Sequence, residues 1–372
     1  MNRNAWQLFS NDLDLAKQTL EIAQAQSHSP ENVASLCQHL TFFGAFEQAQ
    51  RLLLSSEPEV LKHVKARAAL MRIRQYRLHP NPLISLCRAE QTSWFNHICE
   101  RVAGTDQPIQ VDLGCGLGDM LETLAALHTN TTGLKQRTQL IVPAWAQAAL
   151  VPFLNQDQNT HQLSWSDQND PTLQRHNEVS CRLPMMVFKA ALAQTHQAAD
   201  PQPVRAATTN VLKRPTLLCC WRPKVDPLEK LWAHLRSLDW GSIVGLYRQL
   251  VPLAQRTGFD IVDISHYRDH EAQELLHRYP SGLHLGANQL RSFVDTTHWL
   301  GCNSLVASVD TALVHLACWC GHRPIVLAHR WPDGRWLQGS WQNIEILEQE
   351  TLYDWAPPIQ RLIQRVETHA WT

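Results

Sequence analysis

The stretch "SLVASVDTALVHLACWCGHRPIVLAHRWPDGRWLQG", residues 304–339, decides the fold of this chain. An apolar run ends at Asp310 and Thr311, which predicts a buried strand that gives way to a helix at these two residues. The helix carries His315, four residues after Thr311 and therefore on the same helix face. A second apolar run follows Pro324, so the predicted order is strand, helix, strand. This order is typical of α/β layering around a sheet.

The beginning of this helix is a candidate anion site. The first N–H groups of a helix have no partner within it, and the helix dipole is positive at this end. Asp310, Thr311 and Ala312 therefore offer their amides to a diphosphate. A structural interpretation competes with this one, because Asp310 suits the N-cap position and His315 suits a hydrogen-bonded core histidine. The residue types by themselves leave both interpretations open.

A second stretch, "VDLGCGLGDMLETLAAL" (residues 111–127), has the pattern of a strand, a glycine turn and a helix. Turns of this kind bring backbone N–H groups against a phosphate or a nucleotide. Taken over residues 112–118, the stretch resembles the first motif of S-adenosylmethionine methyltransferases. Taken as Gly116-Leu-Gly118-Asp119, it resembles the first loop of certain bacterial glycosyltransferases. The stretch alone does not choose between the two.

Strands and helices are expected to alternate from about residue 105, which predicts two Rossmann-like units in series. The expected strands are residues 109–114 and 138–143 in the first unit, and residues 216–221, 259–265, 304–308 and 324–328 in the second. The expected helices include residues 120–127, 144–154 and 243–255. Residues 164–178 are polar and predicted to form a loop, and residues 191–210 have the composition of a linker. Two such units imply a cleft between them in which a ligand binds.

The first hundred residues are predicted to be helical. Helices are expected at residues 13–26 and 61–78, and a helical pair lies between them. Ser29 and Pro30 make a capped helix start, and two apolar helical runs follow with Gly44 between them. Gly44 and Ala49 occupy the places of the turn glycine and the small packing alanine of a tetratricopeptide hairpin. One or two such units seldom stand alone, so we expect this region to pack on the next domain. The region carries no clustered acid, nucleophile or metal set, so we expect it to dock an acceptor or a partner protein, or to mediate self-association, and not to catalyse.

Composition excludes several classes of function. The chain has 372 residues, and 44% of them are hydrophobic. Its formal net charge is −1, so its overall charge does not attract it to nucleic acid. The N-terminus shows no apolar signal segment, and no apolar run approaches the roughly 18 residues that a membrane span needs. Ten cysteines in a chain of this length do not form a disulfide framework. These features predict a cytoplasmic protein.

Cys318-x-Cys320-x-His322 is a tempting metal cluster. Its spacing differs from the paired Cys-x-x-Cys knuckles that usually hold zinc. The two cysteines are equally consistent with small apolar packing residues in a helix, and we expect no metal ion here.

Three features in order resemble the C-terminal signature of bacterial glycosyltransferase family 9, which includes the lipopolysaccharide heptosyltransferases. They are Val309-Asp-Thr-Ala-Leu-Val-His-Leu-Ala317, then Gly321-x-x-Pro324, then Pro332-Asp-Gly-Arg-Trp336. The likeness covers residues 110–345 and is strongest to the branch in which tetratricopeptide helices precede the transferase. Two departures are present. Cys318-Trp319 replaces the usual glycine and alanine, and Gly334 replaces the first tryptophan of the last motif.

This resemblance implies a GT-B fold of two Rossmann-like domains after an all-α extension. The implied boundaries are residues 1–103 for the tetratricopeptide-like region, 104–208 for the acceptor domain and 209–372 for the donor domain. The implied general base is Asp119, in the loop with Gly116 and Gly118. The family places basic residues after the first strand of the second unit, where Arg222 and Lys224 stand, and an Arg-Ser pair before a helix, as at residues 236–237. The implied donor-binding residues are Arg222, Lys224, Asp310, Thr311, Ala312 and His315.

The implied activity is that of an inverting, metal-independent glycosyltransferase. Its donor is a nucleotide sugar, bound as a substrate with no cofactor, and its acceptor is a glycan, a lipid-linked saccharide or a protein. Such an enzyme works in the cytoplasm or at the surface of the inner membrane. A methyltransferase is the first alternative, although residues 138–145, "TQLIVPAW", lack the acid that would hold a ribose. A non-catalytic scaffold with a degenerate transferase domain is the second.

Overall fold

A computed structural model describes the larger part of the chain. The described residues are 29–42, 46–56, 59–60, 99–104, 108–113, 116–128, 138–156, 164–167, 181–185, 191–192, 212–224, 236–330, 343–351 and 353–371, with Ala66, Ala69, Leu134, Phe188, Pro332, Trp336 and Trp341 as single residues between them. The chain divides into two compact units. One comprises Met1–Phe95, His329–Gln338 and Glu348–Asp354, and the other comprises Asn96–Ala328, Gly339–Leu347 and Trp355–Thr372. The domain boundaries implied by the resemblance stay a prediction.

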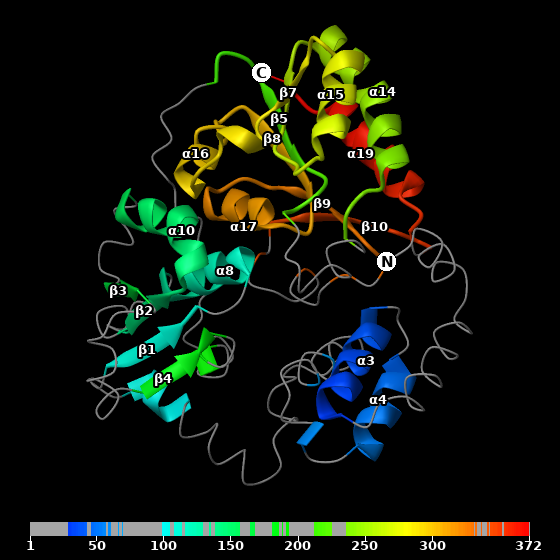
Figure 1. The fold of residues 1–372 in the computed structure, drawn as a ribbon. Helices are drawn as coiled ribbons and strands as arrows, with labels where there is room; N and C mark the ends of the chain where they lie inside the picture. The colour runs from blue at the N-terminus through cyan, green and yellow to red at the C-terminus, as the bar shows by residue number, and fades with distance from the viewer. Residues whose placement is uncertain are drawn as a thin grey trace. The chain divides into compact units, whose positions relative to one another are not determined.

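The structure gives the bounds of two helices in the N-terminal region, α3 (Pro30–Phe42) and α4 (Phe46–Ser55). The Asn32 N–H donates to the Ser29 hydroxyl over 3.3 Å, so the predicted capped start is confirmed. The two helices lie side by side (Figure 1), and they share a small core that includes Ala34, Cys37 and Ala49. Gly44 and the predicted helices at residues 13–26 and 61–78 lie outside the described residues or are described only at single positions. The tetratricopeptide likeness stays a prediction.

The first sheet is parallel and has the strand order β3-β2-β1-β4 (Figure 1). Its strands are β1 (Ile109–Asp112), β2 (Thr138–Val142), β3 (Ser164–Asp167) and β4 (Cys181–Pro184). Helix α8 (Leu117–His128) follows β1, and α10 (Ala144–Gln156) follows β2. The predicted loop at residues 164–178 was wrong at its start, where β3 pairs with β2. An edge strand pairs on one side only, so its sequence need not show the apolar run of a central strand.

The second sheet has six strands in the order β10-β9-β8-β5-β6-β7. Its strands are β5 (Thr216–Cys220), β6 (Asp260–Asp263), β7 (Leu283–Leu285), β8 (Ser304–Val309), β9 (Ile325–Ala328) and β10 (Glu345–Glu348). The pairs among β5 to β9 are parallel. The predicted strands at residues 216–221, 259–265, 304–308 and 324–328 are therefore confirmed, with ends shifted by one or two residues.

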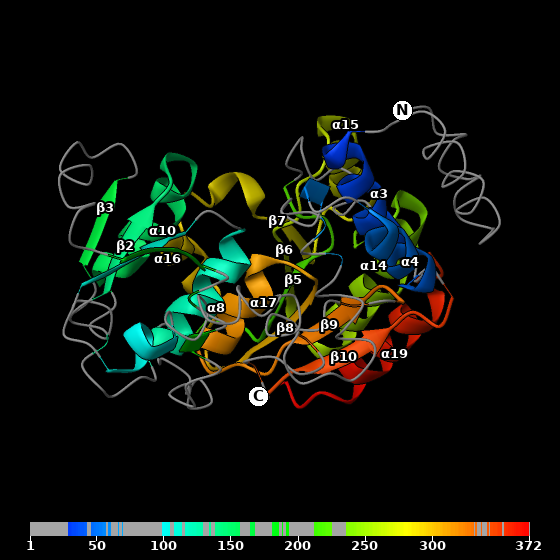
Figure 2. The same ribbon diagram turned by 90° about the horizontal axis from the view of Figure 1, so that it is seen from below.

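Helices cover both faces of the second sheet. They are α14 (Trp240–Thr257), α15 (Asp269–Arg278), α16 (Phe293–Thr297), α17 (Ala312–Trp319) and α19 (Ala356–Thr368). Figures 1 and 2 show α14 and α19 on one side of the strands and α16 and α17 on the other. The core on the α14 side includes Leu217, Ile261 and Leu362, all fully buried. Both sheets are thus mixed α/β layers with parallel strands, as the sequence predicts.

No helix among the described residues is both long enough and apolar enough to cross a membrane.

Candidate functional site

The carboxyl ends of β5 and β8 meet where the strand order of the second sheet reverses. From β5 the chain moves outward through β6 and β7, and it then returns to β8 on the other side of β5. Open α/β sheets bind ligands outside the carboxyl ends of their strands at such a point. The Ser308 hydroxyl donates to the Cys220 backbone carbonyl over 2.9 Å and ties the two strand ends together. Geometry alone thus singles out this edge for a ligand.

Four of the sequence-predicted donor residues lie directly after these two strands. Arg222 and Lys224 follow β5, while Asp310 and Thr311 follow β8. The structure therefore brings residues 86 or more positions apart in sequence to one edge of one sheet. Asp310 and Thr311 are each 8% exposed, and Lys224 is exposed. Ala312 begins the helix that follows. Their contact with a donor stays a prediction.

The N-cap residue of α17 is Thr311, so the proposal that Asp310 caps this helix was wrong. Thr311 has the extended backbone of a cap residue, but its side chain makes no cap hydrogen bond. Instead, the hydroxyls of Thr311 and Ser308 lie 2.8 Å apart and share a hydrogen bond toward the end of β8. The first amides of α17 are therefore not satisfied by their own cap side chain. A helix end of this kind suits an anion.

Asp119 lies at the equivalent point of the first sheet. The chain passes from β1 outward to β2 and β3, while β4 pairs on the other side of β1, so the order reverses beside β1. Helix α8 begins at Leu117, and Asp119 lies in its first turn. A Cβ added to Gly116 would lie 3.4 Å from Asp119 Oδ2, which places this carboxylate against the turn. The predicted strand and helix are confirmed here, while residues 114–115 of the turn lie outside the described part of the chain, and the role of Asp119 as a base stays a prediction.

Helix α8 packs against α17 (Figures 1 and 2), and Gly118 of α8 lies against the ring of His315 in α17. A Cβ added to Gly118 would lie 2.7 Å from His315 Cδ2 and 2.9 Å from Nε2. Only a residue without a side chain leaves room for this ring. The Trp341 indole N–H donates to His315 Nδ1 over 2.9 Å, which assigns the proton of a neutral ring to Nε2. His315 is 1% exposed, so it links the two motif helices from inside.

One of the two departures from the family signature also lies in this contact. Trp319, which stands where the family has alanine, is fully buried at the end of α17. Its ring meets Phe153 of α10 edge-on at 5.7 Å between centroids, and His128 of α8 at 6.2 Å. Edge-to-face ring pairs of this kind stabilise beyond their buried area. A larger residue here thus adds packing between the helices of the first sheet and those of the second.

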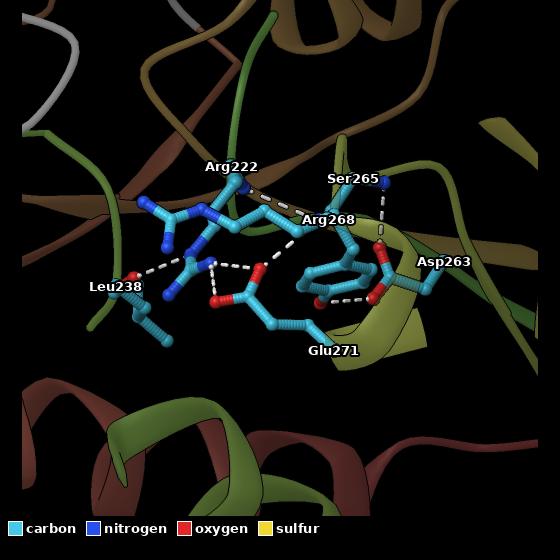
Figure 3. Close-up of polar contacts among 7 residues, drawn as sticks. Arg222, Leu238, Asp263, Ser265, Arg268 and Glu271 are labelled. Atoms are coloured by element: carbon cyan, nitrogen blue, oxygen red, sulfur yellow. Dashed lines mark hydrogen bonds and ion pairs between the residues drawn. The ribbon is translucent and has the colours of Figure 1, made fainter. Parts of the chain in front are cut away.

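Arg222 is held by an ion pair that the sequence did not reveal. Its Nη1 donates to Glu271 Oε1 at 2.9 Å and to Oε2 at 2.8 Å, and its Nε donates to the Leu238 carbonyl at 3.2 Å (Figure 3). Its guanidinium carbon lies 5.7 Å from the Trp240 ring centre and 5.9 Å from that of Tyr267. The side chain of Arg222 is 20% exposed and that of Glu271 is 9%. Such a pair holds the arginine in a single orientation.

Lys224 and His266 lie beside each other at the same edge. The His266 N–H donates to the Arg222 carbonyl over 3.0 Å, so the segment after β6 is fixed to the segment after β5. The surrounding protein and then the charge of Lys224 lower the pKa of His266 below its ordinary value. Both effects disfavour a second positive charge next to the lysine.

A buried polar network supports this edge from below. Asp263, at the end of β6, is fully buried, and its Oδ2 accepts from the hydroxyls of Tyr247 and Tyr267. Its Oδ1 accepts from the Ser265 N–H at 2.8 Å, and the Ser265 hydroxyl accepts from the N–H groups of Trp221 and Arg222 (Figure 3). Burial raises the pKa of Asp263, and the hydrogen bonds from Ser265 and the two tyrosines lower it without cancelling that rise.

Sequence reasoning missed Asp263, Glu271 and Trp341. A weak signal was present for Asp263, because "FDIVDIS" places an acid in a predicted buried strand, where a carboxylate needs partners. No signal marked Glu271, which is one of two glutamates in the polar helix "DHEAQELLHR" and meets Arg222 only in three dimensions. Trp341 follows the last motif and belongs itself to no helix or strand.

The Cys318, Cys320 and His322 cluster lies at the end of α17. Cys318 is 5% exposed, and burial raises the pKa of its thiol well above the ordinary value. Burial also lowers the pKa of the His322 ring. Within the described residues, no group of three or more histidine, cysteine, aspartate or glutamate side chains is gathered as a metal ion would need.

No family model and no protein of curated function matches this chain. Solved structures do resemble it. ADP-heptose lps heptosyltransferase II from E. coli has a TM-score of 0.46 at 14% identity over 70% of this chain and 97% of its own. A glycosyl transferase of family 9 from Veillonella parvula has a TM-score of 0.45 at 11% identity over 66% of this chain and 86% of its own.

E. coli heptosyltransferase WaaC, solved with ADP, has a TM-score of 0.42 at 12% identity over 70% of this chain and 99% of its own. Of these three structures, the one from Veillonella parvula is named as family 9, and the other two are named as heptosyltransferases. The chain is thus similar to glycosyltransferases of family 9 and to heptosyltransferases, while what it binds and does depends on its own residues.

Proposed function

We propose that this chain is a glycosyltransferase that transfers a sugar from a nucleotide-sugar donor to an acceptor hydroxyl, with inversion at the anomeric carbon and without a metal ion. In this proposal the two sheets are the two Rossmann-like domains of a GT-B fold. The first sheet receives the acceptor and the second receives the donor. The N-terminal helices bind the acceptor, a partner protein or a second copy of the chain.

The observation that carries the proposal is the contact between Gly118 and His315. The glycine turn and the "VDTALVH" segment belong to different sheets, and each follows a strand at a point where its sheet order reverses. Packing α8 against α17 places the first turn of one helix beside the first half of the other. A base on the first turn of α8 and a phosphate at the start of α17 then meet in one site. Transfer between two substrates needs both.

Asp119 is the proposed general base. It is partly exposed on the first turn of α8, where a carboxylate can reach an acceptor hydroxyl. As the acceptor oxygen attacks the anomeric carbon, Asp119 takes the hydroxyl proton, and the bond from that carbon to the nucleoside diphosphate breaks. The new glycosidic bond forms on the face opposite the leaving group. The diphosphate departs with the bonding electrons.

The second sheet stabilises that departure. The leaving diphosphate gains negative charge in the transition state, so fixed positive groups lower the barrier. Lys224 supplies an exposed ammonium and Arg222 an oriented guanidinium at the carboxyl end of β5. Thr311 and Ala312 supply the amides at the start of α17. His315 fixes α17 against α8 and carries the proton of Nε2 toward Gly118.

Donor binding tests the proposal. ADP, UDP, GDP, their sugar conjugates and S-adenosylmethionine are compared by thermal shift and then by calorimetry. A ligand at 100 times its dissociation constant adds roughly 2.7 kcal/mol to the free energy of unfolding. We expect stabilisation by one nucleoside diphosphate and none by S-adenosylmethionine, and weaker, less salt-dependent binding in the double variant with Arg222→Ala and Lys224→Ala. Stabilisation by S-adenosylmethionine alone would make the chain a methyltransferase, and stabilisation by neither would leave it a scaffold.

A further inference from the structure

We propose that Glu271 is a positioning residue for the donor diphosphate. It holds the guanidinium of Arg222 so that Nη2 is the nitrogen left to meet a phosphate oxygen. The inference rests on the proposed function, because it names a residue that prepares the same site. Glu271 itself does not touch the ligand in this proposal.

The hydrogen bonds of Arg222 divide its nitrogens into two groups. Nη1 donates to both carboxylate oxygens of Glu271 and Nε donates to the Leu238 carbonyl, so these two nitrogens are engaged. Within the described part of the chain, Nη2 has no hydrogen-bond acceptor. Figure 3 shows that Nη2 points away from Glu271. A guanidinium that is held at two nitrogens and open at the third is a prepared donor of hydrogen bonds.

Glu271 is itself fixed from two directions. It lies in the first turn of α15, where its Oε2 accepts from the Arg268 backbone N–H over 3.1 Å as in a capping box. Burial on its own would raise the pKa of Glu271, but the hydrogen bonds from Arg222 and the Arg268 N–H outweigh it, as do the charges of both arginines, so the pKa lies below the ordinary value. The carboxylate is therefore charged at neutral pH and held by the helix start.

The backbone of Arg222 is fixed as firmly as its side chain. Its N–H donates to the Ser265 hydroxyl at 3.3 Å, and its carbonyl accepts from the His266 N–H at 3.0 Å. Both partners follow β6, whose end is held by the buried Asp263. Two fixed points on the backbone and two on the side chain leave little rotational freedom. Pre-ordering of this kind lowers the entropy lost when a ligand binds.

The proposal and a purely electrostatic account predict opposite signs. Glu271 is a negative charge next to an anion site, so removing its charge should strengthen phosphate binding if only charge counts. If Glu271 orients Arg222, removing it frees the guanidinium and weakens binding. The sign of the change therefore separates the two accounts without any need for a precise magnitude.

The experiment measures the affinity of the full-length protein for ADP, UDP and GDP by calorimetry at two salt concentrations. Glu271→Gln should weaken binding of whichever nucleotide the wild-type protein prefers by roughly tenfold. The matched control is Glu274→Gln, on the same helix, whose carboxylate pairs with Arg278 at 2.7 Å on the surface. It should leave the affinity unchanged. Glu271→Gln and Arg222→Gln should also be non-additive, because the two residues act as one unit.

Glu271→Asp answers the case in which Glu271→Gln does not fold. This variant keeps the charge but draws the carboxylate back by one methylene. A positioning role therefore still predicts weaker nucleotide binding, while a purely electrostatic role predicts unchanged binding. Stronger or unchanged binding in Glu271→Gln, or unchanged binding in Glu271→Asp, would overturn the inference and leave the proposed function standing. A wild-type protein that binds none of the three nucleotides would overturn both.

Discussion

The two sheets prepare their carboxyl edges by different means. At the edge of the first sheet, Asp119 stands on a glycine turn, and the space that Gly118 leaves open admits His315. At the edge of the second sheet, a connected set of buried side chains fixes Arg222 through Glu271 and fixes the end of β6 through Asp263. In the proposed function, the first edge assigns catalysis to Asp119 and packing to Gly118 and His315, whereas at the second edge Arg222 both belongs to this connected set and binds the donor.

The largest effect is expected at Asp119. Asp119→Asn keeps the size and much of the capping ability of aspartate, but it cannot take a proton. We expect turnover to fall by on the order of a hundredfold or more, with donor affinity and thermal stability retained. Steady-state rates and nucleotide affinity, measured on the same preparation, test this.

The competing role for Asp119 is that of a helix cap. That role predicts near-normal turnover in Asp119→Asn together with a small change in stability. Such a result would remove Asp119 from the mechanism. It would also contradict the comparison of the two edges, because Asp119 would then have a structural role and the first edge would have no proposed catalytic residue.

The next effect concerns the contact between the two motif helices. Gly118→Ala places a Cβ 2.7 Å from the His315 ring, which is buried and held by Trp341. Since this ring has little room to move, we expect a loss of roughly 1–3 kcal/mol in the free energy of unfolding. Urea denaturation followed by circular dichroism measures it.

Gly245→Ala is the matched control. Gly245 lies within α14, and an added Cβ there meets nothing within 4 Å. Alanine should then stabilise by roughly 0.5–1 kcal/mol, because it favours the helix over the unfolded chain. The same substitution is thus expected to have opposite signs at the two positions. A stabilising Gly118→Ala would mean that α8 and α17 do not meet as described.

Much of this arrangement was predictable from sequence, and the reason is local. The strand ends at Asp112 and Val309 are marked by apolar runs that stop at polar or glycine residues, and the helices after them have their own periodicity. Arg222, Lys224, Asp310 and Thr311 were implied by the family resemblance, and the structure brings them to one edge because parallel strands align their carboxyl ends.

The remainder depends on contacts between segments far apart in sequence. Arg222 and Glu271 are 49 positions apart, and His315 and Trp341 are 26 apart. An ion pair or a ring hydrogen bond across such a distance leaves no periodic pattern in the sequence. The edge strand β3 was missed for a related reason. It is defined by backbone pairing with β2, and its residue types do not show the pattern of a strand.

A smaller effect separates the two tyrosines at the second edge. The Tyr247 hydroxyl donates to Asp263 and also accepts from the Trp221 indole N–H at 2.8 Å, whereas the Tyr267 hydroxyl contacts Asp263. Tyr247→Phe leaves a buried indole N–H without this acceptor, so we expect a loss of roughly 2 kcal/mol. For Tyr267→Phe we expect about 1 kcal/mol. Equal losses would indicate that the Trp221 bond contributes nothing.

The smallest expected effect is a change in the pH dependence of stability at the second edge. The folded-state pKa of Asp263 is raised above its ordinary value of 3.8, so its contribution to stability is present below that value and is lost as pH rises through the raised pKa. The folded-state pKa of Glu271 is lowered below its ordinary value of 4.5, so its contribution is present above that value and is lost as pH falls through the lowered pKa.

Two single variants isolate these contributions. Relative to the wild-type protein, Asp263→Asn should gain stability as pH rises from about 4 toward neutrality, because it no longer carries a buried charge. Glu271→Gln should instead approach the wild-type stability as pH falls below about 4, where the wild-type carboxylate is also losing its charge. Urea midpoints measured across this range give both trends. Parallel trends in the two variants would show that the pKa values of the two carboxylates are shifted in the same direction. The folded state would then not favour the neutral form of Asp263 and the charged form of Glu271.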